Sequence, residues 1–400
     1  MTGSGEGRPR LTRKLAGFGT TIFSEMTRLA NEAGAINLAQ GFPDFDGPDR
    51  VKRAARRAIE AGHGQYSPST GVPALRKALA RARHLAHGLA YDPDTCVTVG
   101  CGATEMVFAA LLSLCDEGDE VVLFEPFYDS YRAAVALAGA RARVVTLEPP
   151  GFRFDPAALE AAFHERTRVV VLNSPHNPTG KIFSRDELAA IAALCQRHDV
   201  VCIADEVYEH LVYEGEHLPI AALPGMAERT VTVSSMSKTF SLTGWRVGWA
   251  FAPPELSAAL RGAHQFATFA APTPLQIACA EALEQGAEDI ARLRDELRER
   301  RDFLGRALTS AGLEPYPAAG AYFLCAGFGQ YPSFADDVAF CRFLTRDVGV
   351  AAIPPSAFHE GKRATSYVRF VFCKRPETLQ AAAERLARLP ELARQAQPRG

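Results

Sequence analysis

The chain has 400 residues, of which 47% are hydrophobic and 22% charged, enough for one large domain and a smaller one. Its 44 basic and 46 acidic side chains leave a formal net charge of −2, so no overall field favours nucleic acid or an anionic membrane as a partner. No stretch approaches the ~20 apolar residues that a membrane-spanning helix needs.

The nine cysteines are scattered singly, without a C-x-x-C pair, and several stand inside apolar runs such as 200–203. The odd count does not fit a disulfide framework, and a chain of this size can bury a core without one. We therefore expect reduced, mostly buried thiols in a soluble, cytoplasmic protein.

Taken in chain order, an amphipathic helix at 22–32 is followed by a Gly/Pro/Asp loop at 41–48. Nearly continuous apolar runs then alternate with helical patterns, as in strands that helices cover on both faces. Strands are expected at 96–99, 120–124, 143–147, 168–172, 200–204, 230–233 and 246–251, with helices at 103–114 and 130–138. This pattern predicts an α/β fold with a mostly parallel, doubly wound sheet.

After Pro272 helical patterns dominate, at 273–285 and 287–311, and the last part mixes helices with short strands. Those strands are expected at 322–325, 350–353 and 367–372. We predict a large α/β domain over residues 48–305 and a smaller α+β domain built from residues 1–47 and 306–400.

Polar loops follow several of these strands, at the sheet edge where doubly wound folds bind ligands. The turn at 99–105 places Gly100 and Gly102 between a strand and a helix, which makes a phosphate cradle or simply a tight turn. The loop at 173–180 carries two asparagines, which are ligand groups or turn formers.

Asp205 stands at the end of an apolar strand, where a carboxylate is costly to bury unless a cation pairs with it. Tyr208 follows three residues later, within reach of the same ligand. A metal ion could supply the charge, but histidine and cysteine ligands at metal spacing are missing nearby. We interpret the lone histidines His176 and His210 as structural, so no metal site is predicted.

Lys238 lies among small hydroxyl residues, and Arg246 follows eight residues later. Such a lysine could be a solvated surface charge. Its neighbours Met236, Phe240 and Trp245 favour instead a shielded amine with a lowered pKa, suited to nucleophilic chemistry. The segment lacks G-x-x-x-x-G-K-[ST] and so does not fit a nucleotide phosphate loop.

Together these segments resemble the fold-type-I, pyridoxal-phosphate-dependent aminotransferases, and the similarity covers nearly the whole chain. It is closest to the branch that contains kynurenine–oxoglutarate transaminase, also called glutamine transaminase K, and bacterial methionine aminotransferases. The matching strings lie at 37–45, 65–66 with 71 and 75–76, 125–131, 173–181, 205–213, 237–249, 320–324 and 369–374.

The resemblance implies that pyridoxal 5'-phosphate is the cofactor, held by Lys238 as a Schiff base. Lys238 would also shuttle the proton of the reaction, while Asp205 would keep the pyridine nitrogen protonated. Tyr208 and Asn177 would bond the phenolic oxygen of the ring. The other implied contacts are ring stacking by Tyr128 and phosphate binding by Ala103, Thr104, Ser235, Arg246 and the partner subunit's Tyr66. The last contact implies a homodimer with shared active sites.

For the substrates, an amino acid and a 2-oxo acid, the resemblance implies that Arg369 clamps the α-carboxylate. The backbone at Gly41 and the side chain of Asn177 would assist, and Phe23 and Phe358 would line an aromatic pocket. Such a pocket suits methionine, phenylalanine, tyrosine, kynurenine or the neutral amide of glutamine.

Two residues depart from the family pattern. Ala39 stands where a glycine is usual, and its methyl group is expected to be tolerated. His359 stands where relatives often carry Tyr or Cys, so it either alters specificity or faces solvent. We expect it to face solvent.

Other functions stay open beside this one. The substrate could be N-succinyldiaminopimelate or a specialised amino acid of secondary metabolism, and the same scaffold could act as a cysteine-conjugate β-lyase. A cofactor-binding regulator is a different class, but the segment ahead of residue 37 is too short for a helix-turn-helix domain. The joint presence of Lys238, Asp205 and Arg369 favours catalysis.

Overall fold

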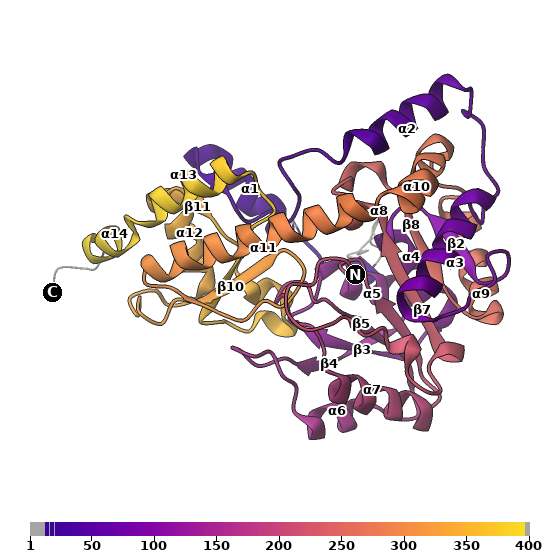
Figure 1. Cartoon of the computed structure of the whole chain (residues 1–400). Coiled ribbons are helices and arrows are strands. Elements are labelled where there is room, and N and C mark those ends of the chain that lie inside the picture. The colour runs from indigo at the N-terminus through magenta and orange to yellow at the C-terminus, as the bar shows by residue number, and fades with distance from the viewer. Residues whose placement is uncertain (1–12, 16, 20, 397–400) are drawn as a thin grey trace, which may run out of the picture.

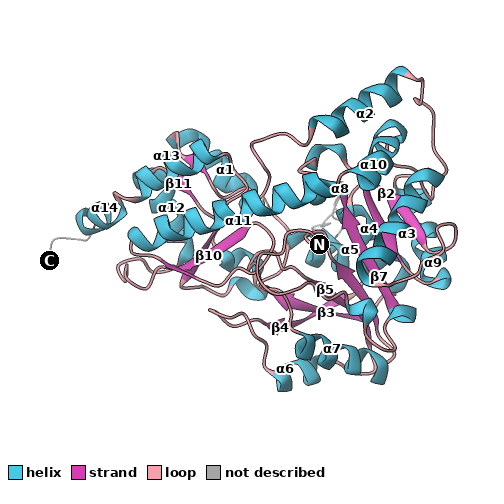
Figure 2. Cartoon of the chain, viewed as in Figure 1, coloured by secondary structure: helices cyan, strands magenta, loops and turns pink. Residues whose placement is uncertain are grey.

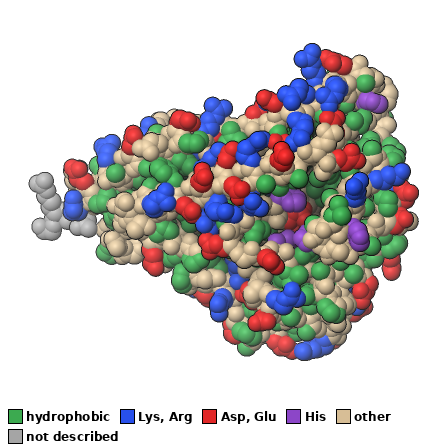
Figure 3. All heavy atoms as spheres, in the orientation of Figure 1, with side chains coloured by type: hydrophobic (Ala, Val, Ile, Leu, Met, Phe, Trp, Pro, Cys, Tyr) green, Lys and Arg blue, Asp and Glu red, His purple; other side chains and the backbone are tan. Residues whose placement is uncertain are grey.

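The computed structural model describes residues 13–15, 17–19 and 21–396. A part with a large sheet lies beside a smaller part, and the long helix α11 (Ala287–Ser310) runs from one to the other (Figure 1). Within the described ranges, no helix combines the length and apolar character that crossing a bilayer would require. Basic and acidic side chains are interspersed over the face seen in Figure 3.

The large sheet has seven strands in the order β2-β8-β7-β6-β5-β3-β4, all parallel to their neighbours except β8. Their bounds are β2 (Val97–Gly100), β3 (Glu120–Glu125), β4 (Arg141–Thr146), β5 (Thr167–Asn173), β6 (Val201–Asp205), β7 (Thr230–Ser235) and β8 (Gly248–Phe251). The predicted α/β fold with a mostly parallel sheet is confirmed. The strand expected to begin at Arg246 begins two residues later, because Arg246 takes a left-handed conformation with φ 53°.

Helices flank the large sheet (Figure 2), so β3, β7 and β8 are buried at every residue. The helices of this part are α2 (Asp49–Glu60), α3 (Pro73–His87), α4 (Ala103–Leu114), α5 (Asp129–Ala138), α6 (Pro156–Ala162), α7 (Arg185–Arg197), α8 (Met236–Thr239), α9 (Pro254–Ala267) and α10 (Thr273–Gln285).

The smaller part combines segments from both ends of the described chain. Its sheets are the pair β1 (Ile36–Asn37) with β11 (Val350–Ala351), and β12 (Tyr367–Val371) with β10 (Phe323–Gly327) and β9 (Glu314–Pro315). Its helices are α1 (Ile22–Ala33), α12 (Asp337–Phe343), α13 (Pro376–Leu386) and α14 (Leu389–Gln395). The domain boundaries near residues 48 and 305 stay a prediction.

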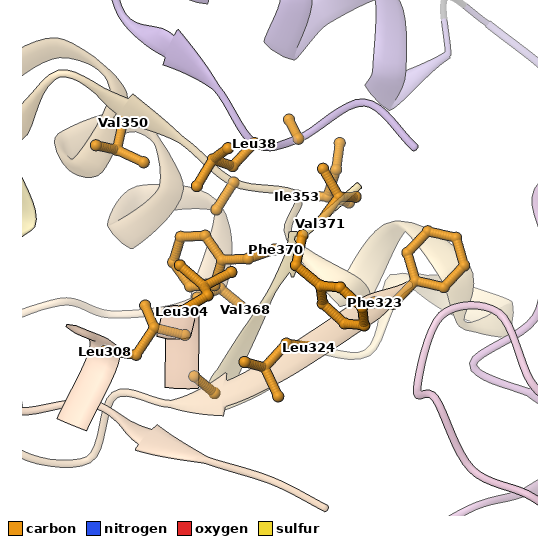
Figure 4. Packing of buried hydrophobic residues seen from close by; sticks show 14 of the residues in the cluster. Leu38, Leu304, Leu308, Phe323, Leu324, Val350, Ile353, Val368, Phe370 and Val371 are labelled. Atoms are coloured by element: carbon orange, nitrogen blue, oxygen red, sulfur yellow. The ribbon is translucent and has the colours of Figure 1, made fainter. Parts of the chain in front are cut away.

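An apolar core joins the sheets and helices of the smaller part to α11. Leu304 and Leu308 of α11 pack with Leu324 of β10 and with Val368 and Phe370 of β12 (Figure 4). Burying these side chains stabilises the smaller part, at about 25 cal/mol per Å² of apolar surface removed from water. Because side chains alternate along a strand, the same packing turns the residue between Val368 and Phe370 away from this core.

Candidate active site

A cavity of about 260 Å³ lies where the ends of β5, β6 and β7 meet the start of α4 and the smaller part. Lys238 and Asp205 both line it, so these two side chains share one space. The predicted site residues that line it are Phe23, Gly41, Ala103, Thr104, Tyr128, Asn177, Asp205, Tyr208, Ser235, Lys238, Arg246 and Arg369. Tyr66 and Phe358 do not.

The amine of Lys238 is placed on α8 beside two aromatic rings. Its Nζ lies 6.0 Å from the ring centroid of Tyr208 and 5.6 Å from that of Tyr322. Burial, with a further contribution from the charge of Arg246, lowers the pKa of this amine to about 8. The unprotonated, nucleophilic share at neutral pH is therefore about a tenth, far above that of an ordinary lysine.

The carboxylate of Asp205 is 6% exposed at the end of β6. It accepts hydrogen bonds from the Tyr131 hydroxyl at 2.6 Å and from the Val207 N–H at 3.3 Å. Burial nevertheless raises its pKa to about 6, because these donors compensate only part of the desolvation. A cationic or proton-sharing group placed against Asp205 would favour its ionised form.

Asn173, the last residue of β5, ties two parts of the site together. Its amide Nδ2 donates to the backbone oxygen of Asp205 at 2.8 Å, and its Oδ1 accepts from the Asn177 N–H at 2.7 Å. Neither Asn173 nor Tyr131 was among the predicted site residues, although both fall within the matching strings. Asn173 ends a strand and Tyr131 lies on a helix, and neither position indicates a contact with Asp205 from the sequence alone.

The start of α4 lies beside the guanidinium of Arg246. Gly102 precedes the helix with φ 90°, and a Cβ there would lie 2.4 Å from Nη2 of Arg246. A Cβ on Gly248 would lie 2.4 Å from the carbonyl carbon of Gly102, so both glycines allow this close approach. Arg246 donates only to the backbone oxygens of Thr243 and Cys101 among the described residues. Unpaired amides of a helix's first turn together with a guanidinium suit a phosphate.

Arg369 is buried to 1% exposure on β12, between Val368 and Phe370, which face the core in Figure 4. Its Nη1 donates to Oδ1 of Asn177 at 3.2 Å and its Nη2 to the oxygen of Ala39 at 2.7 Å. Its Nε has no hydrogen-bond partner, and no ion pair joins it to a carboxylate of the described chain. Burial lowers its pKa to about 10. A buried guanidinium of this kind is costly, so the arrangement calls for an anion.

Aromatic rings enclose this guanidinium. Its Cζ lies 5.4 Å from the ring centroid of Phe23, 4.6 Å from that of Phe323 and 5.3 Å from that of Phe358. Phe358 thus contacts Arg369 from just outside the cavity wall. Tyr322 donates its hydroxyl to the oxygen of Gly41 at 2.6 Å. Tyr322 and Phe323 were not predicted site residues, although the matching string at 320–324 contains them.

A family model described as aminotransferase class I and II matches residues 33–386. The chain belongs to this family. It is 47% identical to a probable N-succinyldiaminopimelate aminotransferase of Mycobacterium tuberculosis, over 94% of this chain and 98% of that protein. The solved structure of the M. tuberculosis enzyme has a TM-score of 0.92 and covers 95% of this chain and 100% of its own.

Two further relatives carry other names. The methionine aminotransferase of Escherichia coli is 44% identical, over 94% of this chain and 97% of that protein. Human kynurenine–oxoglutarate transaminase 1 is 39% identical, again over 94% of this chain and 97% of that protein. The protein is therefore an aminotransferase that uses pyridoxal phosphate, with an amino acid and a 2-oxo acid as substrates.

The cavity of this aminotransferase fits that cofactor at three points. The amine of Lys238 can take an aldehyde, the buried acid of Asp205 can take a ring nitrogen, and the start of α4 with Arg246 can take a phosphate. These groups border one cavity rather than separate ones.

One expectation about this aminotransferase is wrong. His359 does not face solvent but is 5% exposed, with Nδ1 3.5 Å from Oε1 of Glu125. The backbone explains the burial, because the N–H groups of Phe127 and Glu360 bond to the oxygen of Phe358 and to the Glu125 carboxylate. These bonds hold the loop inward on either side of His359.

Proposed function

We propose that this aminotransferase takes the amino group from a neutral or an aromatic or sulfur-containing amino acid, of the methionine, glutamine, phenylalanine or kynurenine type, and that it acts as a homodimer. The buried guanidinium of Arg369 carries this proposal, since it has no carboxylate partner among the described residues. A substrate α-carboxylate would supply the missing anion in a bidentate pair. Gly41 and Asn177 lie beside it in the same wall.

The other residues of the cavity would hold the cofactor. Lys238 would bind it covalently, Asp205 would hold its ring nitrogen in the protonated form, and Tyr208 with Asn177 would bond its phenolic oxygen. The remaining contacts would come from Tyr128 on the ring face and from Ala103, Thr104, Ser235 and Arg246 on the phosphate. When bound, pyridoxal phosphate supplies an electron sink for the electrons of the broken Cα–H bond.

Lys238 would also move the proton of that bond. Its Nζ has a pKa near 8, which allows it to accept a proton from Cα and return it within one cycle. Arg369 would fix the carboxylate so that the Cα–H bond stays oriented toward this amine.

The preference for neutral side chains rests on what lies beyond the first cavity. Phe23, Tyr128 and Ser130 also line an outer cavity of about 790 Å³. Arg132 of that cavity is already paired with Glu360 at 2.9 Å. Four acidic residues line the outer cavity too: Glu25, Asp129, Asp336 and Asp337. A distal carboxylate would therefore meet repulsion or would have to displace Glu360.

N-succinyldiaminopimelate is the second candidate, favoured by the 47% identity to the M. tuberculosis protein. Its distal carboxylates would need Arg132 to leave Glu360. Purified enzyme assayed with a panel of donors and several 2-oxo acids tests both. We expect kcat/KM for methionine, phenylalanine, kynurenine or glutamine to exceed that for N-succinyldiaminopimelate and aspartate by at least about tenfold. The reverse order would overturn the proposal.

Exposed aromatic rings support the homodimer. Tyr66 is 85% and Phe266 87% exposed, and Phe269 lies edge-on to Tyr66 at 5.3 Å. Large apolar rings grouped on a surface are typical of a protein contact. A second copy covering them would bring the partner subunit's Tyr66 to the phosphate. We also propose a cytoplasmic location, in keeping with nine free cysteines of which eight are buried.

Mixed dimers test whether the sites are shared. Tyr66→Ala should weaken each site and Lys238→Ala should inactivate each site. When the two variants are mixed and allowed to exchange subunits, one site per heterodimer regains both an intact Lys238 and the partner subunit's Tyr66. We expect activity to reappear at roughly a quarter of the wild-type level for random exchange. If no activity returns although co-purification of differently tagged subunits shows exchange, Tyr66 does not act across the subunits.

A further inference from the structure

The loop at 354–360 crosses from the smaller part to the end of β3 and is tied there on both sides of His359. The Phe127 N–H donates to the oxygen of Phe358 at 3.0 Å, and the Glu360 N–H donates to Oε2 of Glu125 at 2.8 Å. Glu360 also pairs with Arg132 of α5 at 2.9 Å. The backbone of this loop is thus anchored to the large sheet.

The side chain of His359 meets a buried carboxylate inside this anchor. Glu125 is 6% exposed, and its Oε1 lies 3.5 Å from Nδ1 of His359 and accepts from the Thr146 hydroxyl at 2.8 Å. Burial raises the pKa of Glu125, but the nearby His359 and hydrogen bonds from the Glu360 amide and the Thr146 hydroxyl lower it below its ordinary value. Among the described residues, His359 is the one ionisable group paired with this carboxylate.

Phe358, the residue before His359, connects the contact between His359 and Glu125 to the substrate site. Phe358 is 1% exposed, and its ring centroid lies 5.7 Å from that of Phe23 and 5.3 Å from Cζ of Arg369. Within the described part of the chain two hydrogen bonds, to Asn177 and Ala39, hold the guanidinium, so the rings share in fixing its direction. A displacement of about 1 Å in a binding group can reduce catalysis about a hundredfold.

We infer that His359, through its contact with Glu125, is a positioning residue that holds Phe358 against Arg369 and thereby sets the affinity for the substrate carboxylate. The inference rests on the proposed role of Arg369 and adds a residue that acts on it from the neighbouring loop. His359 does not line the cavity that holds Lys238 and Arg369, although it borders the outer cavity. His359 acts on Arg369 through the neighbouring ring of Phe358.

Three substitutions in the holoenzyme test the contact. His359→Phe keeps a planar aromatic ring and removes the nitrogen that faces Glu125, so the KM of the amino donor should rise about tenfold while kcat changes little. The Kd of 3-phenylpropanoate, a carboxylate that lacks the amine, should rise by the same factor in calorimetry. His359→Asn places an amide nitrogen near the position of Nδ1 and should restore both constants. His359→Gln places its amide near the position of Nε2 instead, so it should not restore either constant.

His164→Phe is the control, because it makes the same change at another histidine that pairs with a buried glutamate, Glu120, at 2.8 Å and away from the cavity. It should leave the Kd of 3-phenylpropanoate unchanged. If His359→Phe lowers only the melting temperature and leaves Kd and KM unchanged, the inference is overturned. Arg369→Lys separates the two claims. An unchanged Kd in that variant would overturn the carboxylate site itself, whereas a raised Kd there with an unchanged Kd in His359→Phe would overturn only the role of His359.

Discussion

Replacing Lys238 with alanine should lower the transamination rate at least about 10⁴-fold and leave the cofactor without covalent attachment. No other lysine lines the described cavity, so no second amine can take over the proton transfer. Borohydride reduction followed by mass spectrometry should show the cofactor bound to the wild-type chain and not to the variant. Lys77→Ala, an exposed change on α3, is the control and should behave as wild type. Wild-type turnover in Lys238→Ala would contradict the mechanism.

The lowered pKa of Lys238 gives this prediction a pH dependence of known sign. Its folded-state pKa of about 8 lies below the ordinary lysine value of 10.5. The unprotonated amine is the nucleophile, so loading of cofactor-free protein with pyridoxal phosphate should become faster as the pH rises through about 8. The appearance of the bound cofactor's absorbance gives the rate. A loading rate that stays constant across this range would contradict a lowered pKa.

Much of the large sheet could be predicted because its strands are buried on both faces and therefore read as unbroken apolar runs. The same runs located Asp205, since a charged residue that directly follows Cys202, Ile203 and Ala204 must lie at a strand end. Helix α4, expected at 103–114, has those bounds because a glycine turn precedes it and an alanine-rich stretch fills it.

Features that depend on distant parts of the chain were not predicted. The helices α2, α3 and α9 were not assigned, although α2 has a marked charged face. The guanidinium of Arg246 approaches Gly102 closely, and Gly102 in turn packs against Gly248, which stands 146 residues later in the chain. The burial of His359 depends on Glu125, which lies more than two hundred residues earlier in the chain. No local sequence pattern indicates a contact between residues so far apart in the chain.

The two arginines of the cavity differ in a way that fits two different anions. Arg246 is exposed at the start of α4, beside unpaired amides that remain in place whether or not an anion is bound. Arg369 is buried among three rings, with its Nε unpartnered. An exposed cation costs little when empty, which suits a phosphate that stays bound between turnovers. A buried one gains most when its anion arrives, so binding energy becomes available in the substrate complex.

Arg369→Met should therefore separate activity from stability. Removing one partner of a buried charge pair costs about 2–5 kcal/mol, so kcat/KM for the amino donor should fall roughly 30- to 4000-fold. The substrate-free enzyme should keep its Tm or gain in stability, because methionine removes a buried, unpaired cation and fills similar space. Arg56→Met, on the exposed face of α2, should change neither quantity. If Arg369→Met loses Tm and kcat/KM together, the guanidinium stabilises the fold rather than the substrate complex, and the proposed carboxylate site is wrong.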